Sequence, residues 1–175
     1  IVDSRERFGD WEADTVLGKQ GTGVLVTLAE RKSRHYLVKR VRSKQADEVR
    51  DAIIEMLRPY AKHVHTITFD NGGEFAGHKA IEAALEAKTY FAHPYSSWER
   101  GLNENFNGLL RQYIPKGTDL RTVTDEEIEQ AQRRVFNILC QPIIGQYDHP
   151  ICRGNGSIAA TASDSNSGWG ASSVL

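Results

Sequence analysis

Apolar and polar residues alternate along the first part of the chain, as expected for β-strands. In residues 10–18 (DWEADTVLG) the odd-numbered positions face one way and the even-numbered positions the other. Residues 24–29 form a short apolar, β-branched run that predicts a buried strand, and residues 35–41 are predicted as a third strand. The glycine-rich residues 18–23 link the first two strands. Three strands with short links predict an antiparallel meander.

The pattern then changes to helical spacing and back. Apolar residues recur every three or four positions in residues 46–60, where Ser43 is expected to cap the start and Pro59 to mark the end. Strands are predicted at residues 64–69 and 89–92, with a short helix at 76–87 between them. Because a helix joins these two strands, they are expected to be parallel. Thr124 and Glu127 fit a capping box, so residues 125–139 are predicted as the last helix. The order predicts an α/β fold: a mixed five-stranded sheet with helices on both faces.

One further predicted helix, around residues 96–113, has two distinct faces. Its apolar stripe consists of Leu102, Phe106, Leu109, Leu110 and Tyr113. Glu104, Asn107 and Arg111 form a polar stripe at i, i+3 and i+7. A helix anchored on one side, with a carboxylate, an amide and a guanidinium on the other, can form the wall of a functional site. The alternative interpretation is an ordinary solvent-exposed face with an Asn–Arg pair.

Charge adds a local feature to this picture. The 175 residues predict one domain, and 22 basic against 23 acidic residues give no overall field that would indicate nucleic acid. Residues 31–44, however, contain no acid and seven basic residues: Arg31, Lys32, Arg34, Lys39, Arg40, Arg42 and Lys44. This stretch is either an exposed hairpin with solubilising charge or a surface that faces phosphates.

The two ends of the chain differ in character from its middle. Residues 153–175 are dominated by Gly, Ser, Ala, Thr and Asn, so we expect a core over residues 1–140 and a largely disordered tail over 141–175. Cys140 and Cys152 have no metal-type spacing, which favours a reducing compartment. No apolar run reaches membrane-spanning length, and because the chain starts at Ile1 we expect a fragment or a processed chain.

Three carboxylates fall where the predicted sheet can bring them together. Asp14 lies in the first strand, Asp70 ends the fourth, and Glu104 follows the fifth. The first and fourth strands are expected to be neighbours. An Asp at a strand end commonly just forms a turn. The three carboxylates together are therefore stronger evidence for a site than any one of them alone. Carboxylates that meet raise each other's pKa values unless a cation joins them, and all-oxygen ligation suits Mg²⁺ or Mn²⁺.

Several segments around these carboxylates resemble a known family. Four segments are similar to the catalytic core of bacterial insertion-sequence transposases of the IS-thirty family. They are GDWEAD (9–14), TFDNGGEF (68–75), PYSSWERGLNEN (94–105) and residues 109–120. The resemblance covers roughly residues 5–134. That core is related to retroviral integrases and has the RNase H-like fold.

The resemblance implies a role for individual residues. It makes Asp14, Asp70 and Glu104 a catalytic, metal-binding DDE triad that takes two Mg²⁺ (or Mn²⁺) ions. Glu12 is expected to be a neighbour of Asp14 and not a ligand. Candidate DNA contacts are Asn71, Asn107, Arg111, Arg31, Lys32 and Arg34.

The resemblance also implies an activity: metal-dependent cleavage at transposon ends and strand transfer into target DNA. Partners would be DNA and further copies of the chain, as a homodimer or higher oligomer, in the bacterial cytoplasm near the nucleoid. Alternatives are a nuclease that cuts RNA–DNA hybrids or junctions, and a catalytically silent remnant or DNA-binding regulator. The family's upstream helix-turn-helix segments have no counterpart in this sequence, and the resemblance stops after Arg134, where a short basic end is expected.

Overall fold

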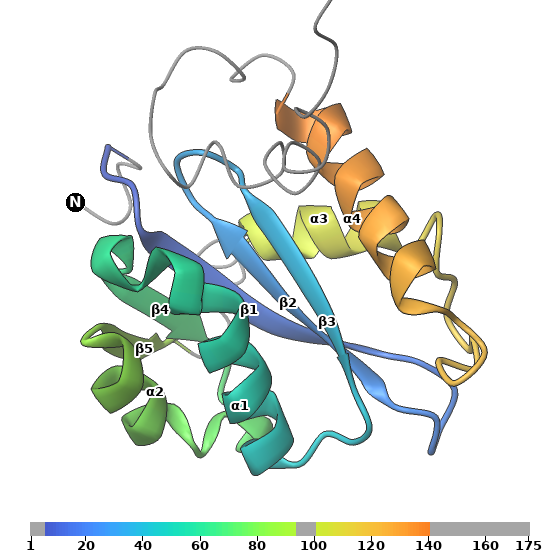
Figure 1. Ribbon diagram of the computed structural model, residues 1–175, viewed down its shortest axis with the longest axis horizontal. Coiled ribbons are helices and arrows are strands. Elements are labelled where there is room, and N and C mark those ends of the chain that lie inside the picture. The colour runs from blue at the N-terminus through green and yellow to red at the C-terminus, as the bar shows by residue number, and fades with distance from the viewer. Residues whose placement is uncertain (1–5, 94–100, 141–175) are drawn as a thin grey trace, which may run out of the picture.

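The first three strands form the antiparallel meander that the apolar runs predict (Figure 1). The computed structural model describes residues 6–93 and 101–140. Strand β1 (Asp10–Leu17) pairs with β2 (Val24–Glu30), which pairs with β3 (Tyr36–Val41). Trp11 lies opposite Glu30 and Leu17 opposite Val24, so the hairpin closes through residues 18–23 as expected.

Two parallel strands complete the sheet on the other side of β1. Strand β4 (Thr66–Phe69) runs parallel to β1, and β5 (Lys88–Phe91) runs parallel to β4, giving the order β3-β2-β1-β4-β5. The predictions that the first and fourth strands are neighbours and that the fourth and fifth are parallel are both confirmed. The mixed five-stranded sheet is therefore confirmed as well.

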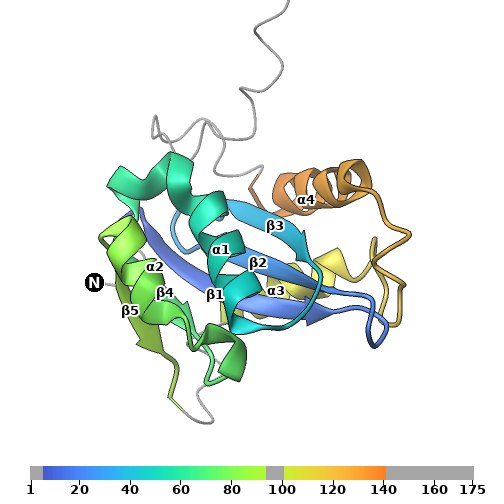
Figure 2. The ribbon, with the colours of Figure 1, turned by 60° about the horizontal axis from the view of Figure 1, so that its bottom comes forward.

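Helices cover both faces of the sheet, in line with the alternation along β1. The α1 (Ala46–Leu57) and α2 (His78–Leu85) helices pack on the face that holds Trp11 and Ala13. The α3 (Gly101–Leu110) and α4 (Asp125–Cys140) helices pack on the face that holds Val16. Figure 1 shows α1 in front of the sheet and α3 behind it, and Figure 2 shows α1 and α2 together on one side.

Several element boundaries differ from the sequence prediction, among them the following three. Ser43 is not the N-cap of α1; Gln45 is, without a side-chain bond, because the Ser43 hydroxyl accepts a hydrogen bond from the Gln45 amide before the helix begins. Pro59 lies inside a 3₁₀ segment, η1 (Arg58–His63), that continues from α1. The α3 helix ends at Leu110, so Tyr113 belongs to the turn that follows.

The capping box at α4 is confirmed in both directions. The Thr124 amide donates to Glu127 Oε2 at 2.7 Å, and the Glu127 amide donates to Thr124 Oγ1 at 3.2 Å. This reciprocal pair satisfies two amides that the first turn of the helix cannot bond itself.

Helix side chains bind backbone amides on both outer strands of the sheet. On β3, the Val38 amide donates to Gln132 Oε1 of α4 at 2.7 Å. On β5, the Thr89 amide donates to Glu82 Oε1 of α2 at 3.0 Å. An edge amide that is bonded in this way is not open to a further strand.

No helix in the described part of the chain is long and apolar enough to cross a membrane. The predicted tail, residues 141–175, lies outside the described residues, so the boundary near residue 140 stays a prediction.

Candidate functional site

Three carboxylates line one face of β1, and each has different partners. Asp10 is buried and accepts hydrogen bonds from Arg7 at 2.6 and 3.1 Å. Glu12 is also buried and forms an ion pair with Arg31 at 3.1 Å. Asp14 is partly exposed, and the amide of the next residue donates to its Oδ1 at 2.8 Å. The two carboxylates of Asp10 and Glu12 are therefore buried and paired with arginines, whereas Asp14 reaches the surface.

The side chain of Asn107 holds Asp14 from the α3 helix. Its Nδ2 donates to Asp14 Oδ2 at 3.1 Å, while its Oδ1 accepts a hydrogen bond from the Tyr36 hydroxyl at 2.9 Å. Because a carboxylate oxygen accepts hydrogen bonds and the amide nitrogen donates them, the contact with Asp14 fixes which end of Asn107 faces it, and the amide oxygen is left to accept from Tyr36. Burial raises the pKa of Tyr36 well above its usual range, and the nearby Asp14 charge acts in the same direction. Tyr36 therefore keeps its proton and remains a donor.

The strand register points to a place for Asp70 beside Asp14. Glu12 lies opposite Thr68 in the parallel β1–β4 pair, and the same offset continued by two residues would place Asp70 beside Asp14. Asp70 follows β4 directly, and its Oδ1 accepts a hydrogen bond from the Gly72 amide at 2.9 Å. The adjacent Asn71 is exposed, and its Nδ2 donates to the Ala92 carbonyl at 3.0 Å. Asn71 thus ties the end of β4 to the end of β5.

The α3 helix is attached to β1 by Asn103, which the sequence analysis did not single out. Asn103 is fully buried; its amide donates to Glu12 Oε2 at 2.9 Å and its Nδ2 to the Glu12 carbonyl at 3.2 Å. One helical turn on lies Asn107, and another turn on lies Arg111, which donates to the Leu17 carbonyl at 2.8 Å. Burial lowers the pKa of Arg111. The i, i+4, i+8 spacing of these polar residues was the signal that could have revealed Asn103.

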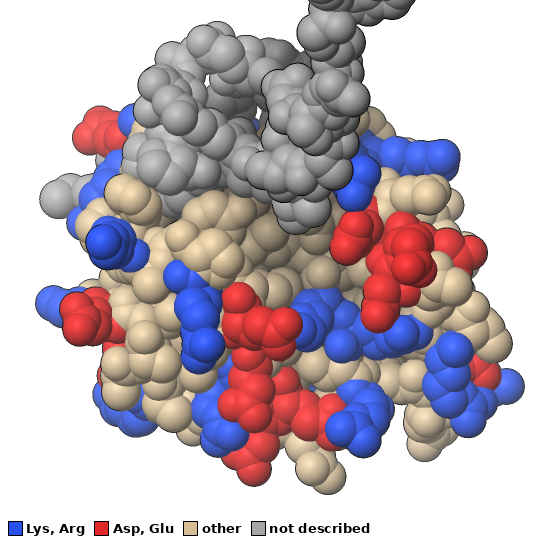
Figure 3. All heavy atoms as spheres, viewed as in Figure 1, with Lys and Arg blue, Asp and Glu red and all other residues tan. Residues whose placement is uncertain are grey.

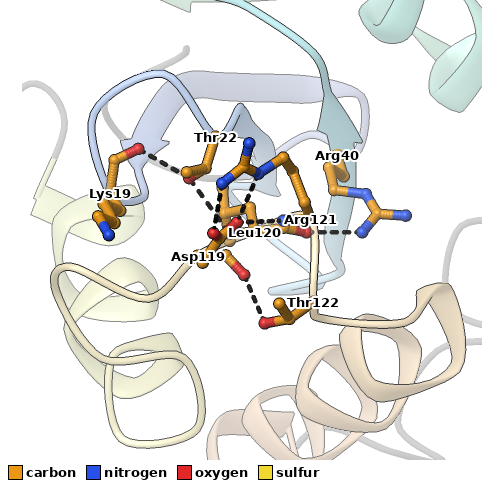
Figure 4. Close-up of polar contacts among 7 residues, drawn as sticks. All are labelled: Lys19, Thr22, Arg40, Asp119, Leu120, Arg121 and Thr122. Carbon is orange, nitrogen blue, oxygen red and sulfur yellow. Dashed lines mark hydrogen bonds and ion pairs between the residues drawn. The ribbon is translucent and has the colours of Figure 1, made fainter.

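The connector between α3 and α4 is bonded to the β1–β2 hairpin (Figure 4). The Lys19 amide donates to the Thr118 carbonyl at 2.8 Å, and the Leu120 amide donates to Thr22 Oγ1 at 3.2 Å. Arg40 of β3 donates to the Leu120 carbonyl at 2.7 Å and lies 2.8 Å from Asp125. These contacts hold the C-terminal end of α3 in place, and with it the whole helix.

Glu104 lies on α3 between the two residues that attach the helix to β1. It is exposed, unlike Asn103 before it. Among residues 6–93 and 101–140, no group of three or more His, Cys, Asp or Glu side chains is close enough to hold a metal ion. In the described structure, Asp14, Asp70 and Glu104 are therefore not gathered into one ligand group.

The donor chemistry nevertheless fits a hard divalent cation. Asp14, Asp70 and Glu104 offer only carboxylate oxygens, which suit Mg²⁺ or Mn²⁺. A side chain at Gly72 would also meet carboxylate oxygen, because an added Cβ would lie 2.8 Å from Asp70 Oδ1. Carboxylates that repel one another come together when a cation joins them, so cation binding itself would favour moving Glu104 inward.

The candidate DNA contacts in the basic stretch have different surroundings. Arg31 is buried and paired with Glu12. Both observations argue against a direct contact between Arg31 and DNA. Lys32 donates to the Glu6 carbonyl at 2.7 Å and lies 4.4 Å from the ring centroid of Phe8. Arg34 is partly exposed. The face in Figure 3 carries acidic and basic side chains interspersed over its described part.

The fold is that of integrase catalytic cores. A chain of the simian T-cell lymphotropic virus intasome superimposes with a TM-score of 0.60 at 16% identity, covering 94% of this chain and 60% of that one. The catalytic core domain of BIV integrase gives a TM-score of 0.54 at 18% identity, covering 75% of this chain and 82% of that domain. At such identities the likeness concerns the fold, and it confirms the predicted RNase H-like architecture.

Sequence relatives define the family more closely. The transposase for element IS4351 of Bacteroides fragilis is 45% identical over 137 residues, covering 78% of this chain and 42% of that protein. The probable transposase for IS1161 of Streptococcus salivarius is 43% identical over 136 residues, covering 77% and 38%. The transposase for IS30A of Escherichia coli (strain K12) is 36% identical over 137 residues, covering 78% and 36%. No protein-family model matches the sequence.

We therefore assign the matched part of the chain to the IS-thirty family of insertion-sequence transposases. This agrees with the resemblance carried by the sequence motifs. The chain spans less than half the length of the curated relatives it matches.

Proposed function

We propose that this chain is the catalytic core of a DDE transposase, which cuts DNA at transposon ends and joins the freed ends to target DNA. The observation that carries the proposal is the parallel register of β1 and β4 in an integrase-like sheet, because this register, continued by two residues, would make Asp14 and Asp70 neighbours. The family assignment supports the same reaction class at a coarser level, since its members act in DNA transposition.

Each residue has a distinct task in this proposal. Asp14 and Asp70 would hold Mg²⁺ or Mn²⁺, with Glu104 as the third ligand from α3. A bound pair of such cations would activate the attacking oxygen and stabilise charge on the leaving oxygen of an in-line displacement. Asn107 orients Asp14 through its amide nitrogen, and Asn103 keeps α3 against β1.

The reaction itself comprises two displacements at phosphorus. In the first, a water oxygen attacks the phosphodiester at the transposon end, and the 3′-oxygen leaves as a free 3′-hydroxyl. In the second, that 3′-oxygen attacks a phosphodiester of the target strand, whose own 3′-oxygen departs. DNA is accordingly the substrate in both steps, and bringing two ends together would require more than one copy of the chain.

Metal binding and nicking by the chain test this proposal. Calorimetry with Mn²⁺ should show binding that is lost in Asp70→Asn, and supercoiled plasmid should be nicked in Mn²⁺ by the unaltered chain but not by the variant. Asp51→Asn is a matched control, because Asp51 is exposed on α1 beside Arg50. Equal Mn²⁺ affinity in all three proteins would refute the site. DNA binding without metal binding or nicking would instead favour a silent remnant or a DNA-binding regulator.

A further inference from the structure

A buried carboxylate outside the proposed triad lies beside the candidate site. Glu74 is at the middle of η2 (Gly73–Phe75), and its side chain is only 3% exposed. Its Oε1 accepts a hydrogen bond from Thr15 Oγ1 at 3.0 Å and forms an ion pair with Lys44 Nζ at 2.7 Å. Both partners of this carboxylate therefore come from segments far away along the chain.

The Thr15–Glu74 bond connects the two segments that carry the candidate aspartates. Thr15 directly follows Asp14 in β1, and Glu74 lies in the turn that begins at Asp70. The residue pairing between β1 and β4 ends at Glu12 opposite Thr68, before either aspartate is reached. Beyond that point, the Thr15–Glu74 bond joins the two segments in place of the strand ladder.

Gly72 shows how closely the turn is packed around these carboxylates. An added Cβ at Gly72 would lie 2.2 Å from Glu74 Oε2 and 2.8 Å from Asp70 Oδ1. Both carboxylates therefore lie close to the Cα of Gly72, and the Gly72 amide donates a hydrogen bond to Asp70. Any displacement of Glu74 would change the space in which Asp70 is held.

The electrostatics favour a charged Glu74 in this position. Burial alone would raise its pKa, but the Lys44 ammonium and the Thr15 hydroxyl outweigh this effect, and the pKa of Glu74 lies below its usual range. Removing one partner of a buried charged pair is costly, because the other charge is left without compensation. Lys44 is half-exposed, with 45% of its side chain accessible, so its ammonium group contacts the buried carboxylate from the solvent side.

We propose that Glu74 is a positioning residue that keeps Asp14 and Asp70 side by side, with Thr15 and Lys44 as its partners. It acts through Thr15 and the turn at Gly72 and not by touching the DNA. The inference rests on the proposed function, because it concerns the same pair of aspartates. It adds a fourth carboxylate to the proposed machinery, one that supports the ligands.

The test compares Mn²⁺ affinity in variants at both ends of the link. Thr15→Val removes the hydroxyl without changing the shape of the side chain, and Glu74→Gln removes the charge that pairs with Lys44. Each should weaken Mn²⁺ binding about 10- to 100-fold, as is usual when a partner of a metal ligand is lost. Thr15→Ser keeps the hydroxyl and should bind Mn²⁺ like the unaltered chain. The double variant should be little worse than either single one, because both break one link.

A second buried carboxylate provides the control for stability. Glu30 is buried and accepts hydrogen bonds from the Gly9 amide at 2.8 Å and the Ser33 hydroxyl at 2.5 Å, away from the 70–74 turn. Glu30→Gln should lower the melting temperature but leave Mn²⁺ affinity of the folded protein unchanged. A drop in affinity of the same size as in Glu74→Gln would mean that Glu74 acts only through overall stability, and the inference fails.

The outcomes separate this inference from the proposed function. If Asp70→Asn loses Mn²⁺ while Thr15→Val and Glu74→Gln bind it normally, the site stands and only the role of Glu74 is refuted. If the unaltered chain binds no Mn²⁺, the proposed function is overturned and this inference with it.

Discussion

Single hydrogen bonds distinguish the polar residues of the β1 face from one another. Asp10 and Glu12 are each paired with an arginine and buried, so their charges are compensated inside the protein. Asp14 instead receives the side-chain amide of Asn107, which the Tyr36 hydroxyl orients. The three carboxylates have the same chemistry and spacing, and their different partners divide them into two structural residues and one candidate ligand.

Glu104→Gln should abolish Mn²⁺-dependent nicking while leaving folding intact. The change keeps the shape of an exposed side chain, on the opposite side of the helix from Leu102 and Phe106, so core packing is unaffected. It removes one negative charge from the proposed cation site, and each 1.4 kcal/mol of lost stabilisation corresponds to about a tenfold slower rate. Nicking assays and thermal unfolding without metal measure the two effects. Wild-type nicking in the variant would remove Glu104 from the triad.

His35 should make the protein less stable at mildly acidic pH. It is fully buried, its Nε2 lies 3.2 Å from the Tyr60 hydroxyl, and burial lowers its pKa from 6.5 to about 4. The unfolded chain therefore binds a proton first, so this stability is present above pH 6.5 and is lost as pH falls toward 4. The total is on the order of 3 kcal/mol.

Urea unfolding between pH 7 and 5 measures this loss in the unaltered chain and in His35→Phe. Burial raises the pKa of Glu30, which has the opposite effect of favouring the folded state as pH falls. Because Glu30 is present in both proteins, the difference between them isolates His35. Parallel stability curves over this range would show that the pKa of His35 is the same in the folded and unfolded states.

At the scale of elements, α3 combines two modes of attachment. Its apolar stripe, Leu102, Phe106 and Leu110, is buried against the sheet, while its polar residues bond directly to β1. The Phe106 ring also stacks on Tyr36, with ring centroids 4.6 Å apart. Apolar packing alone would leave the helix free to shift along the sheet, whereas the hydrogen bonds from Asn103 and Asn107 fix its position along β1.

Asn103→Ala should therefore destabilise the fold more than an ordinary helix substitution. It removes the bond from Nδ2 to the Glu12 carbonyl and leaves a small cavity, a loss of about 1–3 kcal/mol. Thr124→Ala is a useful comparison, because it breaks only the exposed capping box of α4, at about 1 kcal/mol. Urea unfolding gives both values, and nicking should decline in Asn103→Ala alone. A smaller loss for Asn103→Ala than for Thr124→Ala would contradict this account of how α3 is held.

Much of this arrangement could be predicted from the sequence, because it depends on periodicity. Alternation along residues 10–18 gave the two faces of β1, and the capping box gave the start of α4. Asn103 and Glu74 were not found, because their roles depend on partners far away along the chain: Glu12 and Thr15. The Ser43 cap was wrong because a local turn competes for the same hydroxyl.

For the whole molecule, the charge balance bears on the proposed binding of DNA. The net charge is −1, and several basic residues of the 31–44 stretch form ion pairs within the protein, including Lys39 with Glu55, Arg40 with Asp125 and Lys44 with Glu74. A basic side chain that already has a carboxylate partner gains less free energy by pairing with a phosphate. The basic stretch is therefore a weaker DNA surface than its composition suggests.

We expect weak DNA binding by this chain that is independent of sequence and falls steeply with salt. Each phosphate contact should contribute about −0.9 to the slope of log affinity against log salt concentration. Fluorescence anisotropy with unrelated duplexes at several salt concentrations measures the slope, and Arg111→Ala should make it shallower by about one contact. Tight binding to one sequence alone would contradict this expectation.

Two hydrogen bonds at the edges of the sheet matter when the protein is concentrated. The Val38 amide donates to Gln132, and the Thr89 amide donates to Glu82. Exposed edge strands can pair with strands of other chains, and such pairing leads to aggregation. A neighbouring chain that paired along the whole of β3 or β5 would have to displace Gln132 or Glu82 from these amides. At high protein concentration the two side chains therefore oppose continuous strand pairing at the edges of the sheet.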